Sequence, residues 1–407
     1  RPSAQLLLRV LGLLPYPSID IYGSASLVGV PLSEVRLVVR DLLRAHLLTD
    51  AGGERLEWHS LLHAYVRELA KRLDGAERTN ATKRLLEYYL RTAAAADAFL
   101  DSNWESVRRQ ETVPYVVERP LESYSDAMEW FVAELKNLLA AIELAMRHGF
   151  EEYAYRLYWS MTTFLYRHGD WPEWAEKGLV AVKAAERLGH QVACARSHRI
   201  LATAYTRLSQ YEKASYHYTR ARDIFIELGD RVGEAHTELV LGRHFGWLDE
   251  PQEALRHAKR ALLLYRQIGD RGWEARAMND VAREYGRLGN VDEGFRYGTN
   301  ALRLATEVGD RDAEASIHSV LGELSAQRGA IKDALNYYDS AATTRRQLGD
   351  YYGGAKASMQ LAHYTLLDGR RDEARTILIQ AMYDLSNVDH SEAVRLRAEI
   401  LAKLKEV

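Results

Sequence analysis

The chain has 407 residues, enough for about two or three domains with substantial hydrophobic cores. Its 54 Lys and Arg residues nearly balance 57 Asp and Glu, and the net charge of −3 excludes a uniformly basic molecule that coats nucleic acid or an anionic membrane. The single cysteine, Cys194, excludes an internal disulfide and a multi-cysteine zinc site. Frequent Ala- and Leu-rich runs, with only 8 prolines, predict an almost wholly helical protein.

Hydropathy and the start of the chain bear on where the protein works. No apolar run approaches the ~20 residues that a membrane span needs, and the amino terminus lacks the sections of a signal peptide. We therefore expect a cytoplasmic protein that does not bind a membrane. The chain begins at Arg1 rather than Met and soon enters a helical pattern. We expect it to be a piece of a longer polypeptide whose other part carries further chemistry.

Residues 1–73 contain no repeat and are predicted to form a domain of their own. Three helical runs come first, and two short strands follow on either side of a turn at Gly52 and Gly53. In chain order we expect these elements over 4–14, 24–29, 33–46, 47–50 and 55–58. Three helices followed by a small β-hairpin predict a winged-helix domain.

The run after the second strand, residues 59–69, reads HSLLHAYVREL. Together with the runs 11–13 and 42–48, it resembles the winged-helix domain of NB-ARC signalling ATPases, which belong to the STAND class. The nearest likeness is to the AfsR-like antibiotic regulatory proteins of actinobacteria, which usually read His-Asp-Leu-Leu-Arg here. The histidine of that family faces the bound ADP. The resemblance therefore implies that His59 is the nucleotide-sensing position, although Ser60 stands in place of the family's Asp.

The sequence contains no motif that predicts a catalytic or metal site. No G-x-x-x-x-G-K-[ST] phosphate loop occurs, so we expect this chain not to hydrolyse ATP and not to be an enzyme. We expect no cofactor either; ADP or ATP would bind only to an ATPase domain upstream in the longer protein. His59 and His63 are spaced to share one helical face, but no third metal ligand lies near them in the sequence.

Residues 74–149 are predicted to connect the first domain to a repeat region. We expect an Ala-rich helix over 76–100, an extended loop over 101–124 and a second helix over 125–148. The stretch 130–142 is similar to the linker that leads into the repeats of AfsR-like proteins.

A register of 40 residues dominates the rest of the chain. An aliphatic residue followed by Gly and Asp stands at 228–230 and again at 268–270, 308–310 and 348–350. Alanines recur at one position of every unit from Ala181 to Ala381. Small residues at fixed positions are what closely packed helix pairs require. We predict six helix-turn-helix units over 150–389, and a closing helix over 390–407. A glycine after each second helix and the Asp that follows should cap consecutive helices.

These columns resemble the tetratricopeptide repeat in its 40-residue form. Leu201, Tyr205, Ala214 and Ala221 are among the residues that stand where that repeat has its signature Leu, Tyr and Ala residues. The resemblance implies a right-handed superhelix whose concave groove is lined by five positions of each first helix.

Ten of the 30 groove positions obtained by register are Arg or Lys and one is acidic, where the composition of the chain would give about four of each. The residues predicted to bind a ligand or partner are Arg156, Trp159, Tyr166, Arg167, Arg196, Arg199, Arg207, Arg243, Trp247, Arg276, Asn279, Arg283 and Arg287.

Arginine forks suit carboxylates and phosphates, and exposed aromatic rings add stacking area. The groove is thus predicted to bind a protein, a peptide or a small acidic ligand. The alternative is that the arginines pair with acidic side chains of neighbouring helices. Candidates for that pairing are Glu234, Glu238, Glu274 and Glu314.

The first functional hypothesis is the regulatory sensor of a signalling-ATPase-type transcriptional regulator, in which partner binding in the groove controls an upstream ATPase domain. Family resemblance implies control of antibiotic-pathway genes as the output. A free-standing peptide-binding scaffold is a second hypothesis. Direct nucleic-acid binding through the winged helix or the basic groove is a third, although we expect no nucleic-acid partner for this portion, because the winged helix of this class serves the ATPase.

Overall fold

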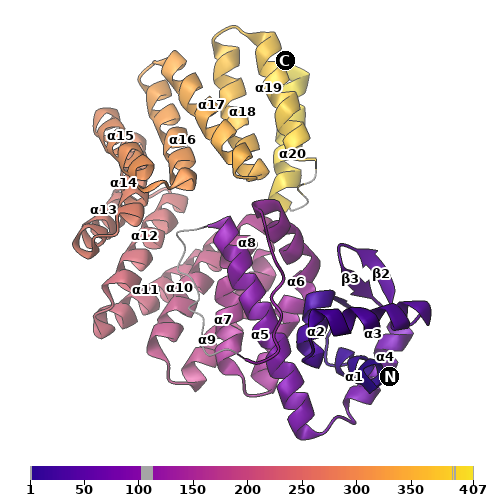
Figure 1. Ribbon diagram of the computed structural model, residues 1–407. Helices are drawn as coiled ribbons and strands as arrows, with labels where there is room; N and C mark the ends of the chain where they lie inside the picture. Colours follow the sequence, from indigo (N-terminus) through magenta and orange to yellow (C-terminus); the bar gives the residue numbers. More distant parts are fainter. Residues whose placement is uncertain (1, 102–112, 387, 389–390, 407) are drawn as a thin grey trace. The chain divides into compact units, whose positions relative to one another are not determined.

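The computed structural model describes residues 2–101, 113–386, 388 and 391–406 (Figure 1). The chain divides into two compact units: Arg1–Phe164 with Glu176–Ser197, and Leu165–Ala175 with His198–Val407. The described residues form 20 helices and three short strands, which confirms the prediction of a mainly helical protein.

The N-terminal module, residues 2–73, combines four helices with a small antiparallel sheet in the order β1-β3-β2. Its elements are α1 (Pro2–Leu11), β1 (Ser18–Asp20), α2 (Ile21–Val28), α3 (Leu32–Arg44), β2 (Thr49–Gly52), β3 (Arg55–Glu57) and α4 (Ser60–Ala70). The predicted hairpin is present as β2 and β3. The prediction lacked β1, which pairs with β3. The three residues of β1 follow a proline and end on the helix cap Asp20, and so short a run shows no alternating pattern from which a strand could be predicted.

Two helix boundaries of this module differ from the predicted ones. The first helix ends at Leu11, and the next residue, Gly12, lies so close to α4 that a Cβ there would be 2.0 Å from the backbone oxygen of Val66. The second helix begins at Ile21, three residues early, because Asp20 accepts a hydrogen bond of 2.7 Å from the amide of Gly23 and caps the helix.

Two long helices, α5 (Gly75–Leu100) and α6 (Tyr124–Arg147), follow and agree with the predicted pair within about one residue. Residues 102–112 of the predicted loop lie outside the described residues. Arg84 on α5 donates to the last carbonyls of α2, those of Ser26, Leu27 and Val28, at 2.9–3.2 Å. Because those carbonyls have no partner within their own helix, the guanidinium joins the N-terminal module to the connector.

The remaining helices follow one another along the chain as six helix-turn-helix pairs and a closing helix. They are α7 (Glu151–Ser160), α8 (Thr162–His168), α9 (Trp171–Arg187), α10 (Gln191–Arg207), α11 (Tyr211–Leu228), α12 (Arg231–Trp247), α13 (Pro251–Ile268), α14 (Arg271–Arg287), α15 (Val291–Val308), α16 (Arg311–Gln327), α17 (Ile331–Gln347), α18 (Tyr351–Leu367), α19 (Arg371–Asp384) and α20 (Ser391–Glu406). Figure 1 shows α12 to α19 stacked as successive pairs, and each of these helices packs against the next. This is the predicted tetratricopeptide-repeat arrangement.

Local chemistry explains why each pair ends where it does. Gly229 has a φ of 67°, a left-handed conformation that ends α11, and Asp230 then accepts a hydrogen bond of 2.9 Å from the amide of Gly233. The same Asp cap recurs one register later at Asp270, and again at 310 and 350. The predicted capping is thereby confirmed.

The first and last parts of the array depart from the regular pair. The first helix of the first pair is interrupted at Met161, which separates α7 from α8. At the other end, α20 is the predicted closing helix, and its Ala393, Leu396 and Ile400 are buried against residues of α19 such as Leu378.

Candidate ligand groove

Three of the thirteen predicted groove residues lie in the first compact unit and are largely enclosed there. The guanidinium of Arg196 lies 4.3 Å from the ring centre of Trp159, whose indole N–H donates to Ser197 Oγ at 3.1 Å. Trp159 is 8% exposed, and the buried Arg156 lies 3.4 Å from Glu152. These three residues pack within the helices rather than presenting free faces to a ligand.

Four groove arginines of the second unit belong to an ion-pair cluster centred on α14. Arg243 and Arg283 both contact Asp280, at 2.8 and 2.6 Å. Burial alone would raise the pKa of Asp280, but the two guanidinium groups outweigh it and hold this pKa below its usual value. Arg276 and Arg287 also have acidic partners close by, at 2.9 Å and 2.7 Å. We call these residues the α14 cluster.

The acidic partners differ from the four that sequence register suggested. Arg276 contacts Asp310, and Arg287 contacts Glu284 and Asp249. The suggested candidates instead pair elsewhere: Glu234 with Arg231 and Arg260, Glu238 with His257, and Glu274 with Arg266. The prediction that the arginines pair with neighbouring acids is therefore confirmed, and three of the four acids named for that pairing are wrong.

Two further arginines are also held by their surroundings. Arg199 is buried, with its guanidinium 5.9 Å from the ring centre of Phe225. Arg167 lies 3.8 Å from Asp312, an acidic residue that also lies within 3.4 Å of Arg276. The predicted Asn279 is buried as well, and its side-chain oxygen has no hydrogen-bond partner within the described part of the chain.

Arg207, at the end of α10, has a different environment. Its guanidinium lies 4.2 Å from the ring centre of Trp171, 5.0 Å from that of Trp247 and 5.3 Å from that of Tyr166. These contacts are within the range of cation–π attraction. We call Arg207 and the three rings the Arg207 box. Sequence register placed Tyr166, Arg207 and Trp247 in the groove but missed Trp171, which follows the turn between α8 and α9.

A carboxylate from the closing helix reaches this box. Glu392, in the first turn of α20, accepts a hydrogen bond of 3.4 Å from Nη2 of Arg207, and it also accepts from the Tyr352 hydroxyl at 3.3 Å. Burial, together with Glu392, raises the pKa of Tyr352. Arg207 is separated from Glu392 by 185 positions, so no local sequence signal could have predicted this contact.

His59, the position implied to sense nucleotide, caps the N-terminus of α4. Its Nδ1 accepts a hydrogen bond of 3.2 Å from the amide of Leu61. Nδ1 of His63 accepts from the indole N–H of Trp58 at 3.3 Å, and burial lowers the pKa of His63. The nucleotide-sensing role of His59, like the expectation that this chain is not an enzyme, stays a prediction.

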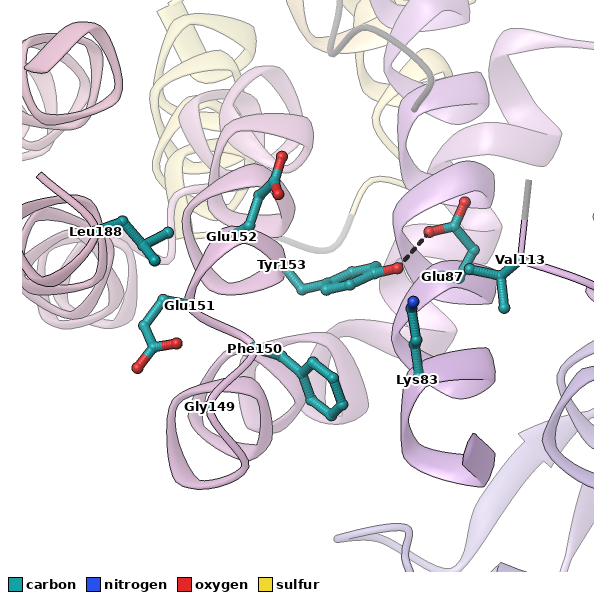
Figure 2. Close-up of a pocket in the computed structure, with 9 residues that line it drawn as sticks. All are labelled: Lys83, Glu87, Val113, Gly149, Phe150, Glu151, Glu152, Tyr153 and Leu188. Carbon is teal, nitrogen blue, oxygen red and sulfur yellow. Dashed lines mark hydrogen bonds between the residues drawn. The ribbon is translucent and has the colours of Figure 1, made fainter. Parts of the chain in front are cut away.

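A separate pocket of about 620 Å³ lies in the first unit between α5 and the start of α7 (Figure 2). Figure 2 shows Lys83 and Glu87 of α5 facing Tyr153, whose hydroxyl donates to Glu87 at 2.8 Å. Glu151 and Glu152 make the α7 side of its lining acidic. The register of groove positions did not predict this pocket.

The paired helices, small residues and capped turns define a tetratricopeptide-repeat superhelix that follows a small α/β module. No protein-family model matches the chain. Over 146 residues the chain is 31% identical to the regulatory protein AfsR of Streptomyces coelicolor, a match that covers 35% of this chain and 15% of AfsR. The resemblance to AfsR-like regulators is thereby confirmed. No helix of the described residues combines the length and hydropathy that crossing a membrane demands.

Several solved structures have a similar succession of helices. One is a STAND protein with a tetratricopeptide-repeat sensor from Pyrococcus horikoshii, with a TM-score of 0.49 and 17% identity over 99% of this chain and 63% of that one. Another is the apo quorum sensor NprR from B. thuringiensis, with a TM-score of 0.49 and 15% identity over 69% of this chain and 82% of that one.

Proposed function

We propose that this chain is the sensor portion of a STAND-type transcriptional regulator. Its repeat array binds a protein, a peptide or a small acidic ligand, and binding controls a nucleotide-binding domain carried by the rest of the polypeptide. Similarity to a regulatory protein over 146 residues supports the regulatory role. A repeat superhelix supports the binding role, because such arrays present long concave surfaces to their partners.

The Arg207 box is the observation that carries the binding role. Arg207 makes one long hydrogen bond, at 3.4 Å, whereas Arg243 and Arg283 of the α14 cluster lie 2.6–2.8 Å from an acidic partner. Tyr166 and Trp247 are both about half exposed, so their rings offer apolar area beside the guanidinium of Arg207, which makes only that one long hydrogen bond within the described part of the chain. A cation flanked by exposed aromatic rings is the kind of anchor that dominates binding energies at protein interfaces.

Selection of displayed random heptapeptides on the immobilised 407-residue chain tests this role. The wild type should enrich a family of related sequences, and R207A should lose that family because its anchor is removed. R303A is the matched control, since Arg303 is exposed on α15 and pairs with Glu307 of the same helix. Equal enrichment by R207A and the wild type would show that the groove does not bind through this box.

The regulatory part of the proposal has its own test. Resemblance to AfsR-like proteins supports an upstream ATPase domain, transcription of antibiotic-pathway genes as the output and a cytoplasmic location. Sequencing the gene upstream of the codon for Arg1 should reveal a glycine-rich phosphate loop followed by Lys. An upstream region that lacks such a loop would favour a free-standing peptide-binding scaffold.

A further inference from the structure

We infer that the Arg207 box is a subsite for a carboxylate, and that Glu392 of α20 is its resident competitor. The inference rests on the proposed function, since it names the chemistry that the groove recognises and a residue of this chain that the ligand must displace. These side chains come from five parts of the second unit: the end of α8, the start of α9, the end of α10, the end of α12 and the first turn of α20.

The aromatic rings set the electrostatics of the subsite. With Trp171, Trp247 and Tyr166 around it, the side chain of Arg207 is 13% exposed. The indole N–H of Trp171 points back to the backbone oxygen of Tyr166, at 3.5 Å, which helps to fix one ring against α8. A guanidinium with little water around it attracts a carboxylate more strongly than one in bulk solvent.

The hydrogen-bonding capacity of Arg207 is largely unused. A guanidinium has five N–H donors and binds a carboxylate best through two parallel bonds of about 2.7–2.9 Å. Glu392 makes one contact with it, at 3.4 Å. Nε of Arg207 is buried and has no hydrogen-bond partner among the described residues. Since Nε and Nη2 form one edge of the fork, a second carboxylate oxygen would satisfy the donor that Glu392 leaves open.

Glu392 can leave without unfolding α20. Its side chain is 21% exposed and belongs to the first turn, whereas α20 is held by Ala393, Leu396 and Ile400 packed against α18 and α19. A ligand carboxylate therefore replaces one side chain and not a helix. Because Glu392 carries the same functional group as its rival, its presence selects for ligands that form the complete two-bond contact.

The experiment titrates the full chain, labelled with [¹⁵N]arginine, with acetyl-Glu-amide, which carries one side-chain carboxylate. The Nε–H resonance of Arg207, identified by its loss in R207K, should move as the probe binds. Acetyl-alanine, whose carboxylate is terminal, distinguishes an acidic side chain from a chain end as the preferred source. Acetyl-Gln-amide is the neutral probe and should leave the resonance unchanged.

The variant E392Q should bind the carboxylate probe about 2-fold more tightly than the wild type, because the contact that the probe must displace is removed. E399Q is the matched control, since Glu399 is exposed on the same helix, and it should match the wild type.

Equal midpoints of the probe titration for E392Q and the wild type would overturn the competitor role. An Arg207 resonance that no carboxylate moves would overturn the subsite. In either case, an Arg207-dependent peptide family in the display selection would leave the proposed function standing.

Discussion

Glu134 in the connector and Glu392 in the repeat array are both carboxylates paired with an arginine, but their environments are opposite. Glu134 is fully buried, lies 2.7 Å from Arg55 and also accepts from the amide of Asn137 at 3.2 Å. Glu392 is 21% exposed and lies 3.4 Å from Arg207. A buried carboxylate with several donors is part of the core, because its removal leaves those buried donors without an acceptor. A partly exposed one whose contacts with Arg207 and with Arg395 of its own helix are long, at 3.4 and 3.3 Å, can be exchanged.

The α14 cluster lies between these extremes. Asp280 is 6% exposed, yet its partners Arg243 and Arg283 keep 44% and 35% of their side-chain surface in solvent. Loss of this carboxylate leaves cations that water can still solvate. The cost of breaking an arginine–carboxylate pair should therefore fall in the order Glu134, Asp280, Glu392.

The largest effect is expected for E134A. Truncation leaves Arg55 and Asn137 with unsatisfied donors in an enclosed site, so the free energy of unfolding should fall by about 3–5 kcal/mol. Urea unfolding at pH 8, followed by circular dichroism, measures this change. E129A is the control, because Glu129 is exposed on the same helix, and it should cost less than about 0.5 kcal/mol. A loss for E134A as small as that of E129A would contradict the structural role.

A pH dependence should accompany this burial. Burial and the nearby Asp20 raise the pKa of Glu134 from 4.5 to about 7, against the opposing effect of Arg55. The folded state thus binds a proton more tightly than the unfolded chain, and this group's contribution to stability falls as pH rises from about 4.5 to about 7. Relative to E134Q, the wild type should lose about 2 kcal/mol between pH 5 and 7.5. A constant difference between the two proteins over that range would refute the raised pKa.

A smaller effect is expected for D280A. Two charge-assisted contacts are lost, but both arginines remain partly solvated, so we expect a destabilisation of about 1–2 kcal/mol. The double variant D280A/R283A should be no worse than D280A alone, because the pair is already broken. Thermal unfolding of the four proteins in this cycle supplies the measurement, and additive losses would mean that Asp280 and Arg283 do not interact.

The sequence was sufficient to predict the repeat fold because its signals are local. The 40-residue register, the glycine at 229 and the capping Asp230 each act within one helix or turn, and all recur. The interruption at Met161 was not predictable, because no proline or glycine marks it. The strand β1 was missed for a different reason, because it is defined by its partner β3 rather than by its own pattern.

The candidate site was predictable only in part. Register found Arg207 and Trp247, because both occupy repeated groove positions. Asp280 could have been recognised as a partner, since it precedes Arg283 by three positions on the same helix. Glu392 could not, because its contact with Arg207 depends on the path of the whole array between them. The groove charge counted from sequence therefore overstated the number of available cations.

The smallest change in stability is expected for E392Q, and here a small value is informative. Glutamine keeps the size of the side chain and its hydrogen bond from Tyr352, while the attraction to Arg207 and to the exposed Arg395 is lost. A pair whose one hydrogen bond is 3.4 Å long should contribute less than about 0.5 kcal/mol to folding, because a bond of that length is weak and Arg207 keeps its contacts with the three rings. Urea unfolding of E392Q and E399Q should give the same midpoint. A loss above about 1.5 kcal/mol for E392Q alone would place Glu392 with Glu134 as a structural residue, and an exchangeable contact at the Arg207 box would then be untenable.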